Sequence, residues 1–318
     1  MSNKPSRGEE KKGSFWETPP GILAVLAALV AVVSGCLPAK PSLLPTQTSP
    51  AASKPGVGST MVSPADSMTM VFVPAGEFTM GSEEGPLDEQ PAHKVFLDPF
   101  WIDKTEITNA LYMLCVQSGG CDQPSSTIYY SDPAYSNHPA AFVSWNDAKD
   151  YCSWAGRRLP TEAEWEKAAS WDPGANEKRV YPWGNDFECK KGNFDDETQL
   201  SSFVVSGGPN CDGYDRTSPV GSFPSGKSPY GALDMAGNVW EWVNDAFIET
   251  DPYGQGKNYY AISPASNQPG VDPSITAYRV LRGGSWNYGI GLGRAAYRLW
   301  FGLDDSYDGM GFRCARSE

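Results

Sequence analysis

Glycine and proline interrupt this chain at short intervals, with 33 Gly and 27 Pro among its 318 residues. Proline removes a backbone hydrogen-bond donor and glycine adds backbone freedom, so both residues shorten helices and strands. The pattern excludes a helical bundle or a heptad repeat and favours short elements joined by loops. A hydrophobic content of 40%, with 12% aromatic residues, is enough to build a core. The sequence therefore predicts an α+β domain that is rich in loops.

Local signals place the first helices and strands. Helices are expected to begin after Thr108, Ser144 and Thr161, and the last two carry the acidic residue of a capping box three positions later. The first helix is expected to run through Leu114, and the second to end at Gly156. Strands are expected within 70–76, 94–97, 100–102, 278–281 and 311–314, where β-branched or aromatic residues gather.

The first 35 residues have the order of a secretory signal, in which basic residues precede an uncharged apolar run, Ile22–Val33. This run is shorter than the roughly 20 residues that span a bilayer. It is followed by Ser34-Gly35-Cys36, so that the whole resembles the bacterial lipobox. Residues 1–35 are therefore predicted to be a signal peptide, with Cys36 lipidated. An uncleaved anchor helix is the alternative.

The next segment, residues 36–67, is rich in Pro, Ser, Thr and Ala and has little apolar content, so it is predicted to be a tether. The folded domain is expected over 68–318. The expected location is the cell envelope, with a membrane-anchored lipoprotein facing outside the cytoplasm. A formal net charge of −13 makes nucleic acid an unsuitable partner. The expected partners are the membrane, through the lipid anchor, and an unknown protein, peptide or glycan ligand.

Short motifs follow one another along this domain. They are Phe78-Thr79-Met80-Gly81-Ser82, His138-Pro139, Val143-Ser144-Trp145, Arg158–Glu166, Tyr181-Pro182-Trp183-Gly184, Gly237–Trp242, Arg282-Gly283-Gly284-Ser285-Trp286 and Gly311-Phe312-Arg313. Together they strongly resemble the formylglycine-generating enzyme, or sulfatase-modifying factor, family, over about Met68 to Arg316. The resemblance implies a compact, loop-rich variant of the C-type-lectin fold.

The resemblance also implies a chemistry for which this chain lacks the ligands. Sulfatase-modifying members use two cysteines, a few residues after the Arg-Gly-Gly-Ser motif, to bind copper and oxidise a substrate cysteine. Here the first position falls on Tyr288 and the second within 290–293, and neither holds a cysteine. Cu(I) needs thiolate or thioether ligands, so no copper and no catalytic residue is expected. Iron-dependent relatives use a histidine cluster, whereas this chain has only His93 and His138.

The cysteines other than Cys36 number six, an even count typical of disulfides in an exported domain. The resemblance pairs Cys152 with Cys314. Sequence proximity then suggests Cys115 with Cys121, and the remaining pair is Cys189 with Cys211. The alternative for any of them is a reactive free thiol.

Two structural calcium sites are implied by the resemblance, since the family's ligand pattern can be followed onto this chain. The first would use the side chains of Asn193 and Asp212 with the carbonyls of Phe194 and Tyr214. The second would use the side chains of Asp234 and Glu241 with the carbonyls of Gly237 and Val239. Carboxylates, amide oxygens and carbonyls are the ligands that Ca²⁺ prefers. In the alternative interpretation both aspartates form turns, and Glu241 is solvated or paired with an arginine.

Two functional hypotheses remain for the segment from about Asn287 to Met310, where the family builds its active site. In the first, the domain is a binding or accessory surface protein whose ligand contacts Ser285, Asn287, Tyr288, Arg294 and Trp300. In the second, it is an oxidoreductase of the same superfamily with an unrecognised active site, built from Ser285, Tyr288 and Arg294. A purely structural envelope protein is a third alternative.

Overall fold

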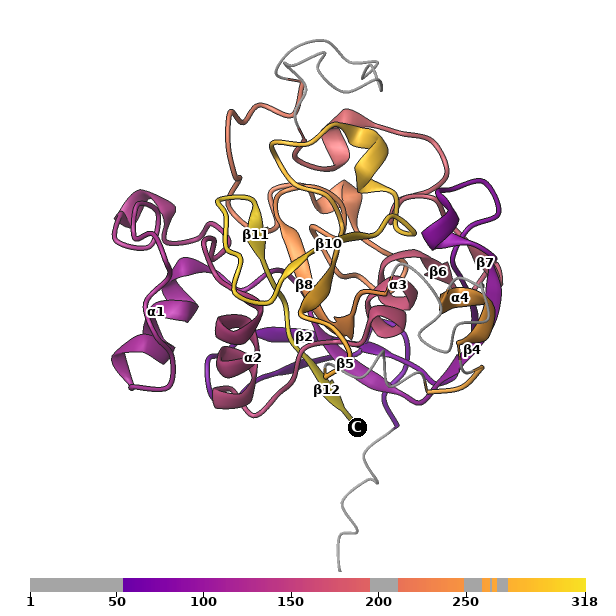
Figure 1. Cartoon of the computed structure of the whole chain (residues 1–318), viewed down its shortest axis with the longest axis horizontal. Helices are drawn as coiled ribbons and strands as arrows, with labels where there is room; N and C mark the ends of the chain where they lie inside the picture. Colours follow the sequence, from indigo (N-terminus) through magenta and orange to yellow (C-terminus); the bar gives the residue numbers. More distant parts are fainter. Residues whose placement is uncertain (1–53, 195–210, 249–258, 264, 268–273) are drawn as a thin grey trace, which may run out of the picture. The chain divides into compact units, whose positions relative to one another are not determined.

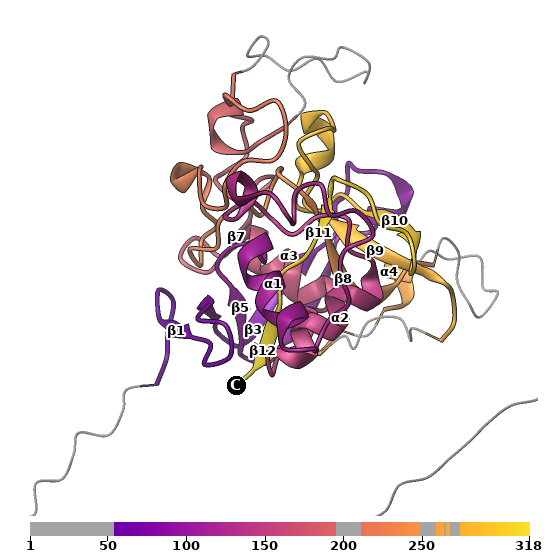
Figure 2. The same cartoon turned by 90° about the vertical axis from the view of Figure 1, so that its left-hand side faces the viewer.

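The first and last strands of the domain lie in one sheet. The computed structural model describes residues 54–194, 211–248, 259–263, 265–267 and 274–318. Its first sheet is antiparallel and has the order β1 (Thr60–Val62), β2 (Thr69–Val73), β5 (Phe100–Asp103) and β12 (Ala315–Ser317). Figure 2 shows β1 and β12 near the C-terminus.

A second sheet of four strands carries the candidate site. Its order is β10 (Leu299–Gly302), β9 (Tyr278–Arg282), β8 (Trp240–Ala246) and β11 (Met310–Gly311), and only β11 is parallel to its neighbour. Two hairpins complete the described strands, β3 (Gly76–Met80) with β4 (His93–Leu97) and β6 (Trp171–Asp172) with β7 (Glu177–Lys178). The β3–β4 hairpin lies far from β11 in Figure 1.

The helices are short and begin where their capping residues predict. They are α1 (Asn109–Gln117), α2 (Trp145–Trp154), α3 (Glu162–Ser170) and α4 (Tyr259–Ile262). Thr108 caps α1, while Ser144 and Thr161 form complete capping boxes for α2 and α3. The predicted end of the first helix at Leu114 is wrong, because α1 continues to Gln117. Five 3₁₀ turns lie between these elements: η1 (Leu87–Glu89), η2 (Pro133–Tyr135), η3 (Cys189–Lys191), η4 (Pro224–Gly226) and η5 (Ile290–Gly293).

Together these elements confirm the predicted α+β class and its high loop content. Both α2 and α3 pack beside β8, as Figure 1 shows. Among the described residues, no helix combines the length and the apolar character that a membrane span requires. The predicted signal peptide and Cys36 lie outside the described residues.

The domain begins earlier in the chain than the sequence predicts. Residues 60–67 were expected to belong to the tether, yet β1 pairs with β2 through Thr60–Val62. Asp66 is buried, and its carboxylate accepts hydrogen bonds from the Tyr151 hydroxyl and the Arg157 guanidinium. The expected boundary at Met68 is therefore wrong, because a polar segment can belong to a fold when its charge finds a buried partner.

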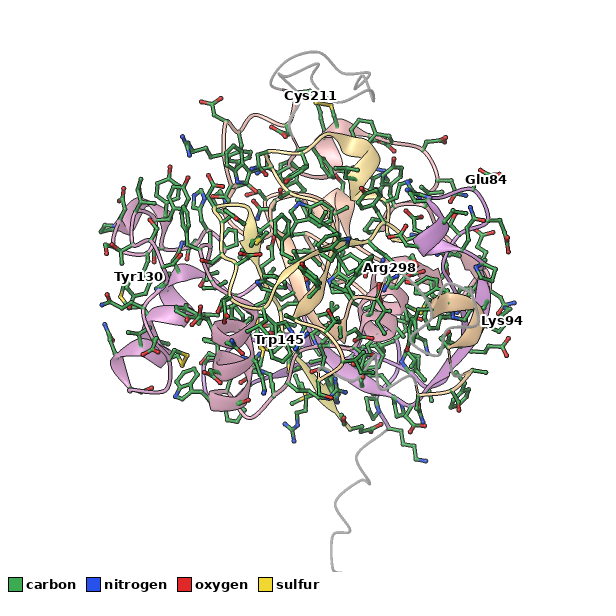
Figure 3. All side chains as sticks on the ribbon, in the orientation of Figure 1. Glu84, Lys94, Tyr130, Trp145, Cys211 and Arg298 are labelled. Carbon is green, nitrogen blue, oxygen red and sulfur yellow. A yellow bond between two sulfur atoms is a disulfide. The ribbon has the colours of Figure 1, made fainter. Side chains whose placement is uncertain are left out.

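The interior contains ion pairs as well as apolar side chains. Arg282 pairs with Glu166, and Arg298 with Glu162, so that both arginines bind the same face of α3. Arg298 lies close to α3 in Figure 3. Such pairs hold their partners strongly, because removing one member leaves an uncompensated buried charge.

All three predicted disulfides are present. Cys152–Cys314 joins α2 to the residue before β12, and Cys115–Cys121 closes the chain after α1. The third, Cys189–Cys211, closes a loop of 22 residues, and Cys211 lies at the edge of the molecule in Figure 3.

Candidate functional site

A cavity of about 210 Å³ opens between β8, β10, β11 and the segment that follows Ser285. Its position agrees with the segment 287–310 that the sequence singles out. The lining residues are Trp240, Asn287, Tyr288, Phe301, Tyr307, Asp308, Gly309 and Met310.

Glycines bring the walls of this cavity together. Gly283 and Gly284 both have positive φ values, +97° and +81°, which turn the chain sharply after β9. Across the cavity, a Cβ at Gly309 would lie 2.9 Å from Asn287 Oδ1 and 3.0 Å from Ser285 Oγ. Any larger side chain at Gly309 would push these two segments apart.

Aromatic rings form most of the wall. Trp240, only 1% exposed, lies edge to face with Tyr288, with ring centroids 5.7 Å apart and an interplanar angle of 78°. Phe301 and Tyr307 form a second tilted pair, 5.5 Å apart at 60°. The indole N–H of Trp240 is buried and has no hydrogen-bond partner among the described residues. The cavity thus combines apolar aromatic walls with one acidic residue, Asp308.

Three of the five predicted ligand-contacting residues come together here. Asn287 and Tyr288 line the cavity, and the Ser285 hydroxyl donates to Asn287 Oδ1 over 2.6 Å. Ser285 itself is fully buried, so its role is to hold the Asn287 side chain in position through this hydrogen bond.

The other two predicted residues lie elsewhere. Arg294 forms a two-fold hydrogen-bonded ion pair with Glu89, at 2.9 and 2.8 Å, and lines a different cavity of about 220 Å³. Trp300 stacks on Phe247, at 5.4 Å between ring centroids. Because alternate residues of a strand point to opposite faces, Trp300 lies on the face of β10 opposite Phe301.

Because Arg294 lines a different cavity, the structure does not bring together the three residues of the predicted oxidoreductase site, Ser285, Tyr288 and Arg294. Ser285 and Tyr288 lie near each other, but Arg294 is bound to Glu89. No base contacts the Ser285 hydroxyl among the described residues, because its hydrogen bond goes to an amide oxygen.

The lining side chains offer Cu(I) a single thioether, that of Met310, which is too few ligands to hold the ion. The lining residues include no cysteine and no histidine. All six cysteines of the described residues form disulfides. No thiolate is therefore available for Cu(I) there.

The residues of the first predicted calcium site lie together. Both Phe194 and Tyr214 donate their backbone N–H groups to the Asp212 carboxylate, each over 2.9 Å. The Asn193 amide nitrogen donates to the Arg216 carbonyl over 2.8 Å. The amide oxygen of Asn193 is buried and has no hydrogen-bond partner in the described part of the chain, as a metal-ligating oxygen would.

The second predicted site is more crowded. Asp234, in a left-handed conformation with φ 56°, accepts a hydrogen bond from Gly221 N over 2.6 Å. Glu241 is held by Arg313 on both oxygens and by the indole N–H of Trp165. Asp234 therefore forms the turn, and Glu241 the arginine pair, that the alternative interpretation describes. Because Arg313 and Trp165 already donate to the Glu241 oxygens, few of the lone pairs of Glu241 are left to coordinate a metal.

One residue near this second site escaped the sequence analysis. Glu106 is fully buried; no N–H or hydroxyl group among the described residues donates to its carboxylate oxygens, and its carboxyl group lies within hydrogen-bonding reach of Asp234. Burial raises the pKa of Glu106 well above its ordinary value, and the nearby charges of Asp234 and Glu241 raise it further. Burial likewise raises the pKa of Asp234. Three carboxyl groups thus share one buried region with Arg313, an arrangement that a proton or a divalent cation would balance.

The described residues contain no set of three His, Cys, Asp or Glu side chains arranged to hold a metal on their own. Both predicted calcium sites depend on backbone carbonyls as well as side chains. The buried amide oxygen of Asn193 in the first site has the chemistry of a ligand for a hard cation, and so does the Glu106 carboxylate, which is not among the predicted ligands but lies near the second site.

Comparison with known proteins gives a consistent result over the whole described domain. Residues 58–318 match the family model described as a sulfatase-modifying factor enzyme 1-like domain. The formylglycine-generating enzyme of Streptomyces coelicolor is 35% identical over 323 aligned residues, which cover 83% of this chain and 93% of the relative.

Other similar proteins carry different names. The serine/threonine-protein kinase pkn1 of Chlamydia caviae is 34% identical over 78% of this chain, but the match spans only 38% of that longer protein. Among solved structures, PvdO from Pseudomonas aeruginosa matches with a TM-score of 0.64 and 27% identity, covering 84% of this chain and all of PvdO.

Proposed function

This chain belongs to the sulfatase-modifying factor family, and we propose that it is a member that binds a ligand instead of generating formylglycine with copper. The observation that carries this proposal is the ring-walled cavity at the place where the resemblance puts the copper-binding cysteines. Tyr288 lines that cavity at the first cysteine position. The cavity offers shape and aromatic contact area, the features typical of a small binding pocket, but no thiolate.

We also propose that the domain is an exported lipoprotein held at the cell envelope through Cys36. The three disulfides support this location, because such bonds persist in oxidising compartments. The tether would then end near residue 59, before β1, and the cavity would face solvent or a neighbouring molecule.

A third part of the proposal is structural calcium. The buried amide oxygen of Asn193 supports it, because this oxygen has no hydrogen-bond partner among the described residues. The buried Glu106 carboxyl group beside Asp234 supports it as well, because a cation would balance the two acidic groups. Asn238 N donates to the Asn193 carbonyl over 2.8 Å, so the two predicted sites are connected through backbone. Calcium would therefore stiffen the loops behind the cavity without taking part in ligand binding.

Two measurements test the binding proposal. The full chain is first incubated with a sulfatase-type Cys-x-Pro-x-Arg peptide, copper and oxygen, and the peptide mass is followed. Formation of formylglycine would overturn the proposal. The full chain is then applied to peptide and glycan arrays. We expect binding that is lost in Tyr288→Ala and kept in Trp300→Ala, the matched control on the opposite face of β10.

A further inference from the structure

From the side chains around the cavity beside Tyr288, we infer that the ligand enters it with an alkylammonium group, such as a lysine side chain or a methylated amine. The inference rests on the proposed binding function and specifies the chemistry that this cavity selects.

The first argument is the arrangement of the rings. Trp240 and Tyr288 stand nearly perpendicular, and Phe301 and Tyr307 are inclined by 60°. All four line one cavity of about 210 Å³, which is large enough for a substituted ammonium group. Aromatic faces carry negative charge density, so several rings around one point attract a cation more than a neutral group of the same shape.

The second argument is the charge around the opening. Asp308 is the sole charged residue among the cavity's lining residues, and Lys and Arg are absent from them. The loop from Leu303 to Gly309, between β10 and β11, also contains Asp304 and Asp305 and has no basic residue. Asp304 accepts a hydrogen bond from Asn146, and Asp305 accepts one from the backbone N–H of Gly302, so both help to hold the loop in place. A negative rim beside aromatic walls concentrates cations.

Arg216, the basic residue that pairs with Asp308, does not neutralise the negative charge beside the cavity. Arg216 lies 4.0 Å from Asp308, and its side chain is 54% exposed. It donates to the Tyr129 hydroxyl over 2.7 Å and lies over the Trp286 ring. An exposed pair at this distance interacts weakly and is screened by salt, so Asp308 remains available to a cationic ligand.

The test compares cations with neutral molecules of the same shape. Binding to the full chain is measured by calorimetry with choline against 3,3-dimethylbutan-1-ol, and with N-acetyl-lysine amide against N-acetyl-norleucine amide. We expect at least one cation to bind about tenfold more tightly than its neutral counterpart, as expected for a desolvated cation among several rings. Binding of choline would identify a methylated amine as the ligand group, and binding of N-acetyl-lysine amide would identify a lysine side chain. Equal or tighter binding of the neutral molecules would overturn the inference, as would no binding of either cation.

Variants locate the effect. Tyr307→Leu and Asp308→Asn should each weaken cation binding several-fold, and the loss in Asp308→Asn should shrink as salt is raised. Trp300→Leu is the matched control, since Trp300 is also an exposed aromatic residue, at 41%, but lies on the other face of β10. Unchanged thermal midpoints show that the variants fold. If an array ligand depends on Tyr288 while no cation binds, the chemistry inferred here is wrong and the proposed binding function stands.

Discussion

The disulfide Cys152–Cys314 should stabilise the domain more than the disulfide Cys115–Cys121. It closes a loop of 162 residues, whereas Cys115–Cys121 closes one of 6. In the chain-entropy model these lengths correspond to about 5 and about 2 kcal/mol, because a longer loop restricts the unfolded chain more. The perturbation is the pair of double variants Cys152→Ala/Cys314→Ala and Cys115→Ala/Cys121→Ala.

These two double variants form a matched comparison. Cys152, Cys314 and Cys115 are fully buried, so both variants also leave small cavities in the same apolar cluster. The difference of about 3 kcal/mol is therefore assigned mainly to loop closure. At roughly 2–4 °C per kcal/mol for a domain of this size, it corresponds to a difference in thermal midpoint of about 6–12 °C.

The assay is urea unfolding of the full chain, followed by tryptophan fluorescence, with calorimetry for the thermal midpoint. Equal losses in the two variants would refute the loop-closure reasoning. A larger loss for Cys115→Ala/Cys121→Ala would show that local packing around α1 dominates instead.

Three further outcomes are expected. Excess EGTA should lower the thermal midpoint of the wild-type chain and affect Glu106→Gln much less, because the variant lacks one carboxylate of the proposed calcium region; equal shifts would exclude Glu106 as a ligand. Arg298→Met should lose about 2–3 kcal/mol in urea unfolding, because Glu162 would stay buried with only Arg282, 3.5 Å away, and the Tyr260 hydroxyl as partners; a loss below about 1 kcal/mol would contradict this. Burial raises the pKa of Asp103 to about 7 and that of Asp245 to about 8, so the native state holds protons that the unfolded state has released. Stability should therefore fall as pH rises from about 4 to 8, and less steeply in Asp245→Asn.

The parts of the fold that depend on neighbouring residues could be predicted from the sequence. Ser144 and Thr161 act as caps because their partners lie three positions ahead. The pairing of Cys115 with Cys121 follows from a separation of 6 residues. The resemblance also marks the segment that contains Asn287 and Tyr288, and a cavity lies there; ligand binding by these residues stays a prediction.

Two of the expected ligand residues lie away from this cavity, because their positions depend on contacts across long stretches of sequence. Arg294 was assigned to the ligand, but its partner Glu89 lies 205 residues earlier. Trp300 is close in sequence to the other expected ligand residues, but closeness in sequence does not put it on the same surface. It lies in a strand, and the period of two turns it to the other face.

One feature of the sequence marks Glu106 as a candidate functional residue. It lies between β5 and α1, next to Ile107, which is fully buried, and an acidic residue in such a segment needs a partner. The sequence does not say that the partner region is Asp234 and Glu241, more than a hundred positions later. The three carboxyl groups come together only in the folded chain.

The placement of β12 beside β5 has a consequence for biosynthesis. A ribosome releases Phe100 long before Ala315, so the first sheet lacks its β12 strand, and Cys152 lacks its sulfur partner, until the segment that contains Cys314 and Ala315 has been made. Neither the sheet nor this disulfide can therefore be completed by the residues that precede that segment, and α2 must wait for it in an unlinked state.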